Sequence, residues 1–211
     1  ERKIDKAGQP LPADAALEVR GRDHPWVSRG GIKLAHGLDH FGFVVTGAVA
    51  LDVGSSTGGF TDVLLTRGAS KVYAVDVGTN QLGWKLRSDP RVVVHEQTNA
   101  RDLTSETIPD PIDIVVCDAS FISLAKVLDA ALDLAKSGAK LVALVKPQFE
   151  AGREEVGKGG VVRDPEVHRR VCDTAAQWVQ SKGWRVLGVE PSPITGPEGN
   201  VEFLLGAIKE G

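Results

Sequence analysis

The chain has 211 residues, of which 42% are hydrophobic and 25% charged, and its net charge is −3. These proportions are ordinary for a soluble globular protein, and the slight acidity argues against a histone-like binder of nucleic acid. No stretch approaches the ~18 uninterrupted apolar residues of a membrane helix, so we expect no membrane partner. Cys117 and Cys172 form no Cys-x-x-Cys pair, which predicts reduced thiols in a cytoplasmic protein. No histidine or cysteine cluster has metal-ligand spacing, so we expect no metal.

The start of the chain differs from the remainder in charge. Residues 1–33 carry seven Lys/Arg against five Asp/Glu, a balance of +2, whereas the rest carries 18 against 23. Such a basic stretch could touch phosphates, although a solvated surface is the plainer interpretation. We expect a small polar segment over 1–23 with one short strand at 16–19, a linker over 24–28, and one domain over 29–211.

From residue 32 onward, helical periodicity alternates with apolar runs. The predicted helices span 32–42, 60–67, 81–87, 124–136 and 165–182. Near-continuous apolar runs, typical of strands buried on both faces, lie between them at 48–53, 71–76, 92–97, 112–117 and 140–146. This alternation predicts an α/β fold, with a parallel sheet covered by helices on both faces.

The end of the chain breaks the alternation. Two further strands, at 185–190 and 201–208, are joined by a short segment rich in proline and glycine with no room for a helix. Parallel neighbours need a crossover of about a dozen residues or more, so these strands should be antiparallel. A seven-stranded, Rossmann-like sheet that is mostly parallel and has a reversed C-terminal strand is the architecture of class I methyltransferases. Dehydrogenase-type Rossmann domains lack that reversed strand.

A glycine-rich loop follows the first predicted strand and opens a helix. A dinucleotide fingerprint requires Gly-x-Gly-x-x-Gly, whereas this loop has Gly54, then Ser56, then Gly59. The middle glycine, where a pyrophosphate needs bare backbone, is missing. A cofactor without a diphosphate therefore fits better, and S-adenosylmethionine is one. The residues expected to contact it here are Asp52, Gly54, Ser55, Ser56, Thr57, Gly58, Gly59, Phe60 and Thr61.

Other predicted cofactor residues follow the next strands. Asp76 ends the second strand, where a carboxylate can accept both ribose hydroxyls. Asn99, Arg101 and Asp102 follow the third strand, in position to border an adenine. A structural aspartate beside a glycine-rich turn is the alternative interpretation of this set.

Four charged residues are candidates for the reacting centre. Asp118 and Lys146 end the fourth and fifth strands, Glu202 opens the reversed strand, and Lys33 lies in the first predicted helix of the domain. The carboxyl ends of parallel strands and the start of a reversed one share an edge of the sheet. Each residue alone could be a solvated charge, and the sequence does not bring the four into contact.

The stretch from residue 26 to the end resembles the TlyA family, once labelled hemolysins and now grouped with FtsJ-like ribose 2′-O-methyltransferases. The matching motifs are Ser-Arg-Gly-Gly-x-Lys-Leu at 28–34, the glycine loop at 52–61, and the segments 98–101, 118–124, 145–150 and 199–203. Residues 1–23 resemble the tail of an S4 RNA-binding domain. The resemblance implies methylation of a ribose 2′-hydroxyl, with cytidine of ribosomal RNA expected, by a tetrad of Lys33, Asp118, Lys146 and Glu202. Asp118 would also border the cofactor.

Within that tetrad we expect Lys146 to be the general base. A lysine is normally protonated, but burial and a second cation such as Lys33 favour the neutral amine. Asp118 and Glu202 would orient the amines, but their negative charges raise the lysine pKa and so favour the protonated form.

Other interpretations remain beside this one. They are a pore-forming hemolysin, which lacks support because the sequence has no membrane span or secretion signal, a cofactor-binding module without turnover, and a nicotinamide dehydrogenase. The glycine-rich stretch 152–163, with Arg153, Lys158 and Arg163, is either a lid or RNA-contacting loop or an ordinary surface loop. The oligomeric state is left open.

Overall fold

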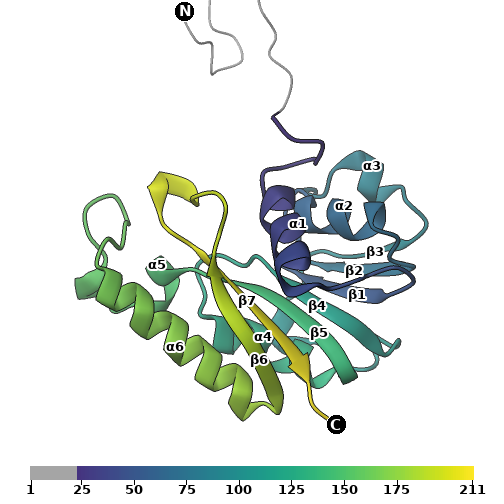
Figure 1. Ribbon diagram of the computed structural model, residues 1–211. Coiled ribbons are helices and arrows are strands. Elements are labelled where there is room, and N and C mark those ends of the chain that lie inside the picture. Colours follow the sequence, from purple (N-terminus) through teal and green to yellow (C-terminus); the bar gives the residue numbers. More distant parts are fainter. Residues whose placement is uncertain (1–22) are drawn as a thin grey trace, which may run out of the picture.

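The computed structural model describes residues 23–211, and the main domain is built on one seven-stranded sheet with the order β3-β2-β1-β4-β5-β7-β6 (Figure 1). β7 runs antiparallel to both of its neighbours, β5 and β6, whereas the other pairings are parallel. This arrangement confirms the predicted sheet and its reversed last strand. The strands are β1 (Val49–Val53), β2 (Lys71–Val75), β3 (Val92–His95), β4 (Ile112–Cys117), β5 (Ala135–Val145), β6 (Trp184–Pro191) and β7 (Phe203–Lys209).

Helices cover both faces of the sheet, because successive side chains of each strand point to opposite sides. Ala50 of β1 packs in one buried cluster with Leu34 and Leu64, while the next residue, Leu51, belongs to a second cluster with Leu128. The helices are α1 (Gly30–Phe41), α2 (Gly59–Thr66), α3 (Trp84–Arg87), α4 (Leu124–Asp133), α5 (Pro147–Glu150) and α6 (Pro165–Ser181), with 3₁₀ turns η1 (Ala100–Asp102), η2 (Arg153–Glu155) and η3 (Pro197–Gly199). None of these described helices is long and apolar enough to cross a membrane.

Several element boundaries differ from the sequence-based prediction. α4 ends at Asp133 rather than 136, because Ala135 already pairs with Ile112 and begins an extended β5. α3 begins at Trp84, so residues 81–83, which were predicted as helix, are loop. β7 begins at Phe203, which leaves Glu202 just before the strand. In each case pairing or packing with distant residues decides the boundary, and local propensity does not contain that information.

The residues predicted as a linker, 24–28, lie against the domain. The backbone N–H of Val27 donates to Asp62 Oδ2 at 2.9 Å. The Trp26 side chain lies directly over Gly31, where a Cβ would come within 2.3 Å of the indole. The predicted S4-like segment and its strand at 16–19 lie almost entirely in residues 1–22, outside the described residues.

Candidate active site

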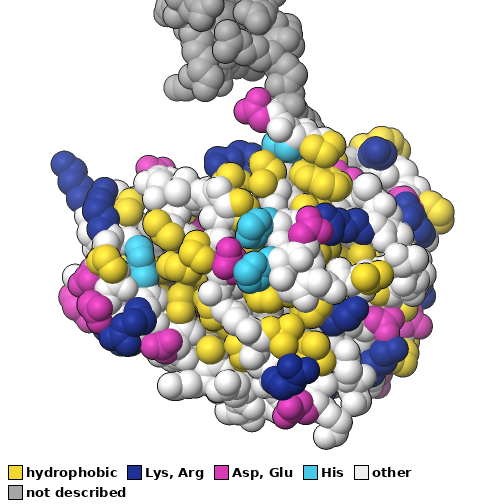
Figure 2. Space-filling view, viewed as in Figure 1, with side chains coloured by type: hydrophobic (Ala, Val, Ile, Leu, Met, Phe, Trp, Pro, Cys, Tyr) yellow, Lys and Arg dark blue, Asp and Glu magenta, His cyan; other side chains and the backbone are white. Residues whose placement is uncertain are grey.

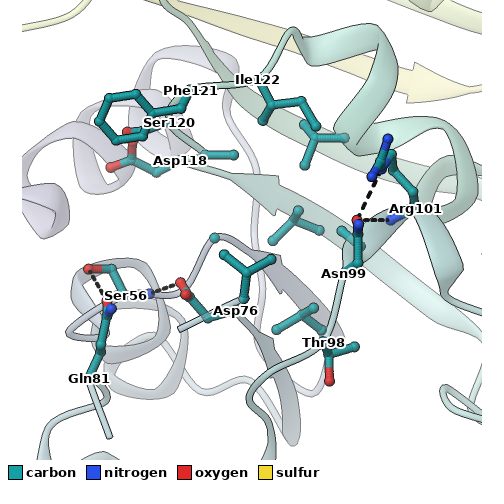
Figure 3. A pocket seen from close by; sticks show the side chains of 17 residues that line it. Ser56, Asp76, Gln81, Thr98, Asn99, Arg101, Asp118, Ser120, Phe121 and Ile122 are labelled. Carbon is teal, nitrogen blue, oxygen red and sulfur yellow. Dashed lines mark hydrogen bonds between the residues drawn. The ribbon is translucent and has the colours of Figure 1, made fainter. Parts of the chain in front are cut away.

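A cavity of about 440 Å³ opens at the carboxyl ends of β1, β2 and β4. Its volume is in the range of small-molecule sites, about 300–1,000 Å³. β1 and β4 are neighbours at the point where the strand order reverses, the place where open α/β sheets bind ligands. The labelled polar residues of its wall are Ser56, Asp76, Gln81, Thr98, Asn99, Arg101, Asp118 and Ser120 (Figure 3).

The turn after β1 requires its glycine. Gly54 has φ +79, and a Cβ on it would come within 2.9 Å of the Asp118 backbone oxygen. The backbone N–H groups of Gly54 and Ser55 donate to the Val75 oxygen at 2.9 and 3.1 Å. The loop is therefore pressed between the ends of β2 and β4, and it leaves room for a ligand above it.

Asp76 presents a carboxylate that backbone groups hold in place. Its Oδ2 accepts a bond from the N–H of Ser56 at 2.8 Å (Figure 3), and its Oδ1 accepts one from the N–H of Gly78 at 2.8 Å. A carboxylate has about four acceptor positions, so two remain for ligand hydroxyls. Asn99 lies across the cavity, and its Oδ1 accepts from the backbone N–H and Nε of Arg101 at 3.1 and 3.2 Å.

Part of the predicted cofactor set does not line the cavity. Gly59 shows why, since a Cβ there would come within 2.3 Å of Ser28 Oγ and 2.9 Å of the Gly31 nitrogen. Its role is to let the start of α2 pack closely against the start of α1. The predicted residues away from the cavity wall are Asp52, Ser55, Thr57, Gly58, Gly59, Phe60, Thr61 and Asp102.

Asp52 lies behind the loop and is fully buried. Its Oδ2 accepts a bond from the Thr61 hydroxyl at 2.7 Å, while its Oδ1 has no hydrogen-bond partner among the described residues. Burial raises the pKa of Asp52 to about 7, and the bond from Thr61 opposes this rise. The negative charge of Asp118 raises it further.

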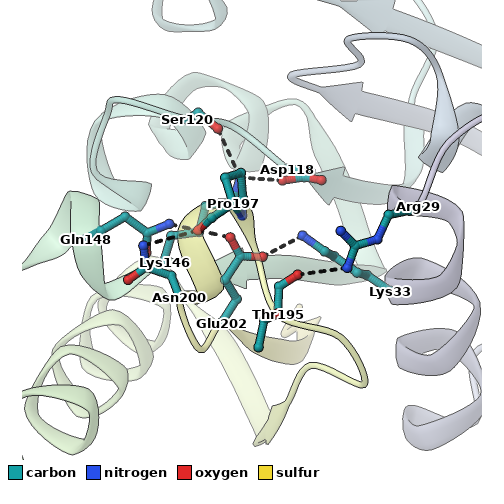
Figure 4. A network of polar contacts seen from close by, with 10 residues as sticks. All are labelled: Arg29, Lys33, Asp118, Ser120, Lys146, Gln148, Thr195, Pro197, Asn200 and Glu202. Atoms are coloured by element: carbon teal, nitrogen blue, oxygen red, sulfur yellow. Dashed lines mark hydrogen bonds and ion pairs between the residues drawn. The ribbon is translucent and has the colours of Figure 1, made fainter. Parts of the chain in front are cut away.

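The four candidate residues of the reacting centre form two ion pairs (Figure 4). Lys33 Nζ lies 2.5 Å from Glu202 Oε2, and Lys146 Nζ lies 2.5 Å from Asp118 Oδ1. Lys146 also donates to Ser120 Oγ at 3.1 Å. The structure thus pairs each lysine with one acid, a pairing that the sequence could not specify.

The elements that carry these side chains explain their approach. Lys33 lies in the first turn of α1, and Lys146 is the residue between β5 and the short helix that starts at Pro147. Glu202 is held by the loop after β6, where a Cβ on Gly196 would come within 2.1 Å of Glu202 Oε1. A side chain at this position would therefore have to displace the carboxylate that pairs with Lys33.

Some contact residues were not among the predicted ones. Gln148 Nε2 donates to Glu202 Oε1 at 3.5 Å, and Arg29 Nη2 donates to the Thr195 oxygen at 3.3 Å. Ser120 and Gln148 lie inside motifs that the sequence marked, but a serine or glutamine at a strand end gives no signal of its own. The Arg29 contact joins residues far apart in the chain and has no sequence signature.

The stretch 152–163 is anchored next to this centre. The buried side chain of Asn200 accepts from the N–H of Val162 at 3.1 Å and donates to the Gly160 oxygen at 3.0 Å. Arg153, Lys158 and Arg163 are exposed. The loop is therefore tied to the segment that carries Glu202 while its cations face outward.

The reversed β7, the cavity at the β1–β4 switch point and the adjoining charged centre define a class I methyltransferase. Residues 26–209 match the model of the FtsJ-like methyltransferases, and the chain belongs to this family. The match leaves out the residues of the predicted S4-like segment.

Three comparisons with known proteins agree with this class. The 16S/23S rRNA (cytidine-2′-O)-methyltransferase TlyA of Mycobacterium tuberculosis is 54% identical over 209 residues, which cover 96% of this chain and 78% of the relative. A solved structure from Lactococcus lactis, provisionally called a hemolysin, is 48% identical with a TM-score of 0.85, covering 88% of this chain and 89% of that chain. An S-adenosylmethionine dependent methyltransferase from Mesorhizobium loti shares the fold alone, with a TM-score of 0.62 at 15% identity, covering 82% of this chain and 96% of that chain.

Proposed function

We propose that this methyltransferase uses S-adenosylmethionine and methylates a ribose 2′-hydroxyl, that of a cytidine in ribosomal RNA. The observation that carries the proposal is the position of Asp118. Its side chain lines the cavity and also pairs with Lys146 at 2.5 Å, so a cofactor and a base would meet at one residue. The named reaction of the relative at 54% identity supports the choice of substrate.

The cavity suits the proposed cofactor in size and charge. S-adenosylmethionine supplies a methyl group on a cationic sulfonium. Asp76 would accept its ribose hydroxyls with the positions left free by Ser56 and Gly78, and Asn99 and Arg101 would border the adenine. The carboxylate of Asp118 adds negative charge to the wall, which favours a cationic ligand over an anionic one.

Lys146 is the residue that we assign as the base. A ribose hydroxyl is a poor nucleophile until its proton is removed, and a positioned base contributes about 10²–10⁴-fold to such a step. Lys146 would first release a proton to solvent. Its neutral Nζ would then accept the proton of the ribose hydroxyl while the oxygen takes the methyl group and the sulfonium becomes a neutral thioether, and Asp118 and Ser120 fix the direction of the amine. Lys33 and Glu202 form a second ion pair that is enclosed in the fold, and we assign to it the task of holding α1 in place beside the site.

Phe121 gives the site a surface on which a base can stack. Its side chain is 90% exposed, although it lies beside the cavity. Its backbone has φ +65, a strained conformation for a bulky residue and one that tends to persist at functional sites. Single-stranded nucleotides are commonly bound by stacking on aromatic rings. We assign the target base to this ring, and the phosphates to exposed cations such as Lys158. A ribosomal substrate would place the protein in the cytoplasm.

The test uses the purified protein, methyl-labelled S-adenosylmethionine and separated small and large ribosomal subunits lacking the modification. Labelled RNA is digested to nucleosides and separated. The expected product is 2′-O-methylcytidine, which distinguishes ribose from base methylation. Label in a base or in no RNA, with cofactor binding intact by calorimetry, would overturn the substrate assignment and leave the cofactor assignment standing.

An Asp76→Ala variant tests the cofactor assignment separately from the substrate assignment. We expect it to lose cofactor affinity by about 10–100-fold, the size of losing one or two good hydrogen bonds to a charged group. Asp173→Ala, which changes an exposed aspartate on α6, is the matched control. Equal binding by both variants would contradict the place of the cofactor.

The hemolysin name of a structural relative suggests one further assay, which tests for lysis of membranes. The same preparations are added to erythrocytes and to lipid vesicles loaded with a dye. We expect no release of haemoglobin or dye. Release at the concentrations that methylate RNA would show that the domain has a second, lytic activity.

A further inference from the structure

A cluster of two histidines and a glutamate lies outside the site described above. His36 and His40 are one turn apart on α1, and Glu190 lies on the edge strand β6. The Nε2 atom of each histidine is 3.6 Å from a different oxygen of Glu190. Figure 2 shows histidine side chains beside an acidic group near the middle of one face, over the end of α1.

The distances in this cluster are longer than hydrogen bonds and suit a shared ion. An N–H···O bond spans about 2.7–3.2 Å, so at 3.6 Å the carboxylate faces both rings without bonding them closely. Zinc binds nitrogen and oxygen at about 2.0–2.2 Å, and two ligands of a tetrahedron are then about 3.4 Å apart. The three ligand atoms lie within 4.8 Å of one another, so small side-chain rotations would complete the geometry.

Two features hold the ligands ready. The rings of His36 and His40 are nearly parallel, at 16° with centroids 6.1 Å apart, and the Nε2 atom of each faces Glu190 at 3.6 Å. The Nε2 atom of His36 is buried and has no hydrogen-bond partner among the described residues. Such an atom loses its water without receiving a bond in return, and a metal ion would supply one.

The packing of Phe41 beneath the cluster holds the end of α1 against the sheet. The ring of Phe41 lies flat on Gly206 of β7, where a Cβ would come within 2.5 Å of it. The same ring packs edge-on against His40, with centroids 4.8 Å apart. The end of α1 is therefore packed closely on β7, the strand that pairs with β6.

We infer that His36, His40 and Glu190 bind a divalent transition-metal ion, for which Zn²⁺ is the best match. Imidazole is a ligand of Zn²⁺, Cu²⁺ and Ni²⁺, and two histidines with one carboxylate are an established zinc set with one position open to water. The ion ties α1 to β6 across the face of the sheet. Because Lys33 lies on the same helix, the ion also stiffens the element that carries one tetrad lysine.

The test measures binding of zinc chloride by calorimetry to protein without a histidine tag, in the absence of RNA and cofactor. Its outcome is therefore independent of the proposed methylation. We expect one saturable site per chain and a melting temperature that rises with zinc. His36→Ala, His40→Ala and Glu190→Gln should each weaken binding at least tenfold and abolish the rise in melting temperature.

The matched control is His168→Ala, which removes another half-buried histidine, one whose Nε2 already contacts the Val162 oxygen at 2.8 Å. It should leave zinc affinity unchanged. Circular dichroism without zinc checks that each variant is folded, and the three ligand changes affect partly exposed side chains. No saturable site in the unmodified protein, or a site that survives all three ligand substitutions, would overturn the inference.

Discussion

The two lysine–carboxylate pairs of the site have the same length and different surroundings. Lys33 and Glu202 are sealed, with side chains 9% and 0% exposed, whereas Lys146 and Asp118 are 7% and 22% exposed. Asp118 also lines the cavity. The first pair is thus enclosed in the fold, and the second has one member that faces a ligand.

This difference separates two tasks that the tetrad would otherwise share. Charges taken out of water cost several kcal/mol each unless they are paired, so a sealed pair depends on both members. A pair that opens onto a cavity keeps some solvent and can exchange a proton there. We therefore expect changes in the open pair to affect catalysis first, and changes in the sealed pair to affect stability first.

The largest effect is expected from Lys146→Met, which removes the base while keeping most of its volume. Methyl transfer to ribosomal subunits should fall about 10²–10⁴-fold, measured in a single turnover at saturating cofactor. Cofactor affinity should change little. Lys126→Met, on the exposed side of α4, is the control. A Lys146→Met variant within threefold of the unmodified rate would remove this lysine from the chemistry.

The next effect compares stabilities. Glu202→Gln leaves the Lys33 ammonium buried without its partner, so the free energy of unfolding should fall by about 3–5 kcal/mol. Asp118→Asn, at the more exposed pair, should cost clearly less. Equilibrium unfolding in urea measures both. A Lys33→Met/Glu202→Gln double variant should recover much of the loss, and equal losses for Glu202→Gln and Asp118→Asn would contradict the comparison.

The sequence predicts the sheet well because burial leaves a local trace. The apolar runs at 112–117 and 140–146 and the proline-rich join before 201–208 were sufficient for strand number and for the direction of β7, which the structure confirms. It overextended α4, because the pairing of Ala135 with Ile112 is invisible in a local window. Interactions between distant residues determine such ends.

The sequence marked the residue types of the candidate site but not their contacts. Strand-end periodicity places Asp118 and Lys146 at one edge, but nothing in the sequence decides which acid Lys33 meets. The predicted loop residues extend beyond the cavity wall, and Gly59 packs the start of α2 against α1; their contact with the cofactor stays a prediction. The proposed metal site departs from the sequence-based expectation, because a histidine pair one turn apart reveals nothing about Glu190 on a distant strand.

The carboxylate of Asp52 is as deeply buried as that of Glu202. Its bonded partner, however, is a hydroxyl, that of Thr61, and not a cation. Burial raises the pKa of Asp52 from 3.8 to about 7. The folded protein therefore holds a proton that the unfolded chain releases. This contribution to stability is fully present below about pH 4 and is lost as the pH rises through about 7.

The measurement compares the free energy of unfolding at pH 5 and pH 8 for the unmodified protein and Asp52→Asn. The free energy of unfolding should change less with pH in Asp52→Asn than in the unmodified protein. The difference over this range should be roughly a few kcal/mol, because the group with the raised pKa is gone. Asp118→Asn should shift the midpoint to lower pH, since the charge of Asp118 raises the pKa of Asp52. The same slope in all three proteins would mean that another group is responsible.

The smallest effect is expected at a solvent-exposed pair that joins Asp39 of α1 to Arg67 at the end of α2. Arg67 bonds both oxygens of Asp39 at 2.6 and 3.1 Å, and the Asp39 side chain is 69% exposed. Exposed pairs contribute about 0–1 kcal/mol, so Asp39→Asn should cost less than about 1 kcal/mol in urea unfolding.

The hydrogen bond from Arg67 lowers the pKa of Asp39. The contribution of this pair to stability is therefore present above the ordinary pKa of an aspartate, and it is lost as the pH falls through the lowered pKa of Asp39. Added salt should screen it and should leave the cost of Glu202→Gln nearly unchanged. A cost for Asp39→Asn equal to that for Glu202→Gln, or one equally insensitive to salt, would show that burial is not what distinguishes the sealed pair.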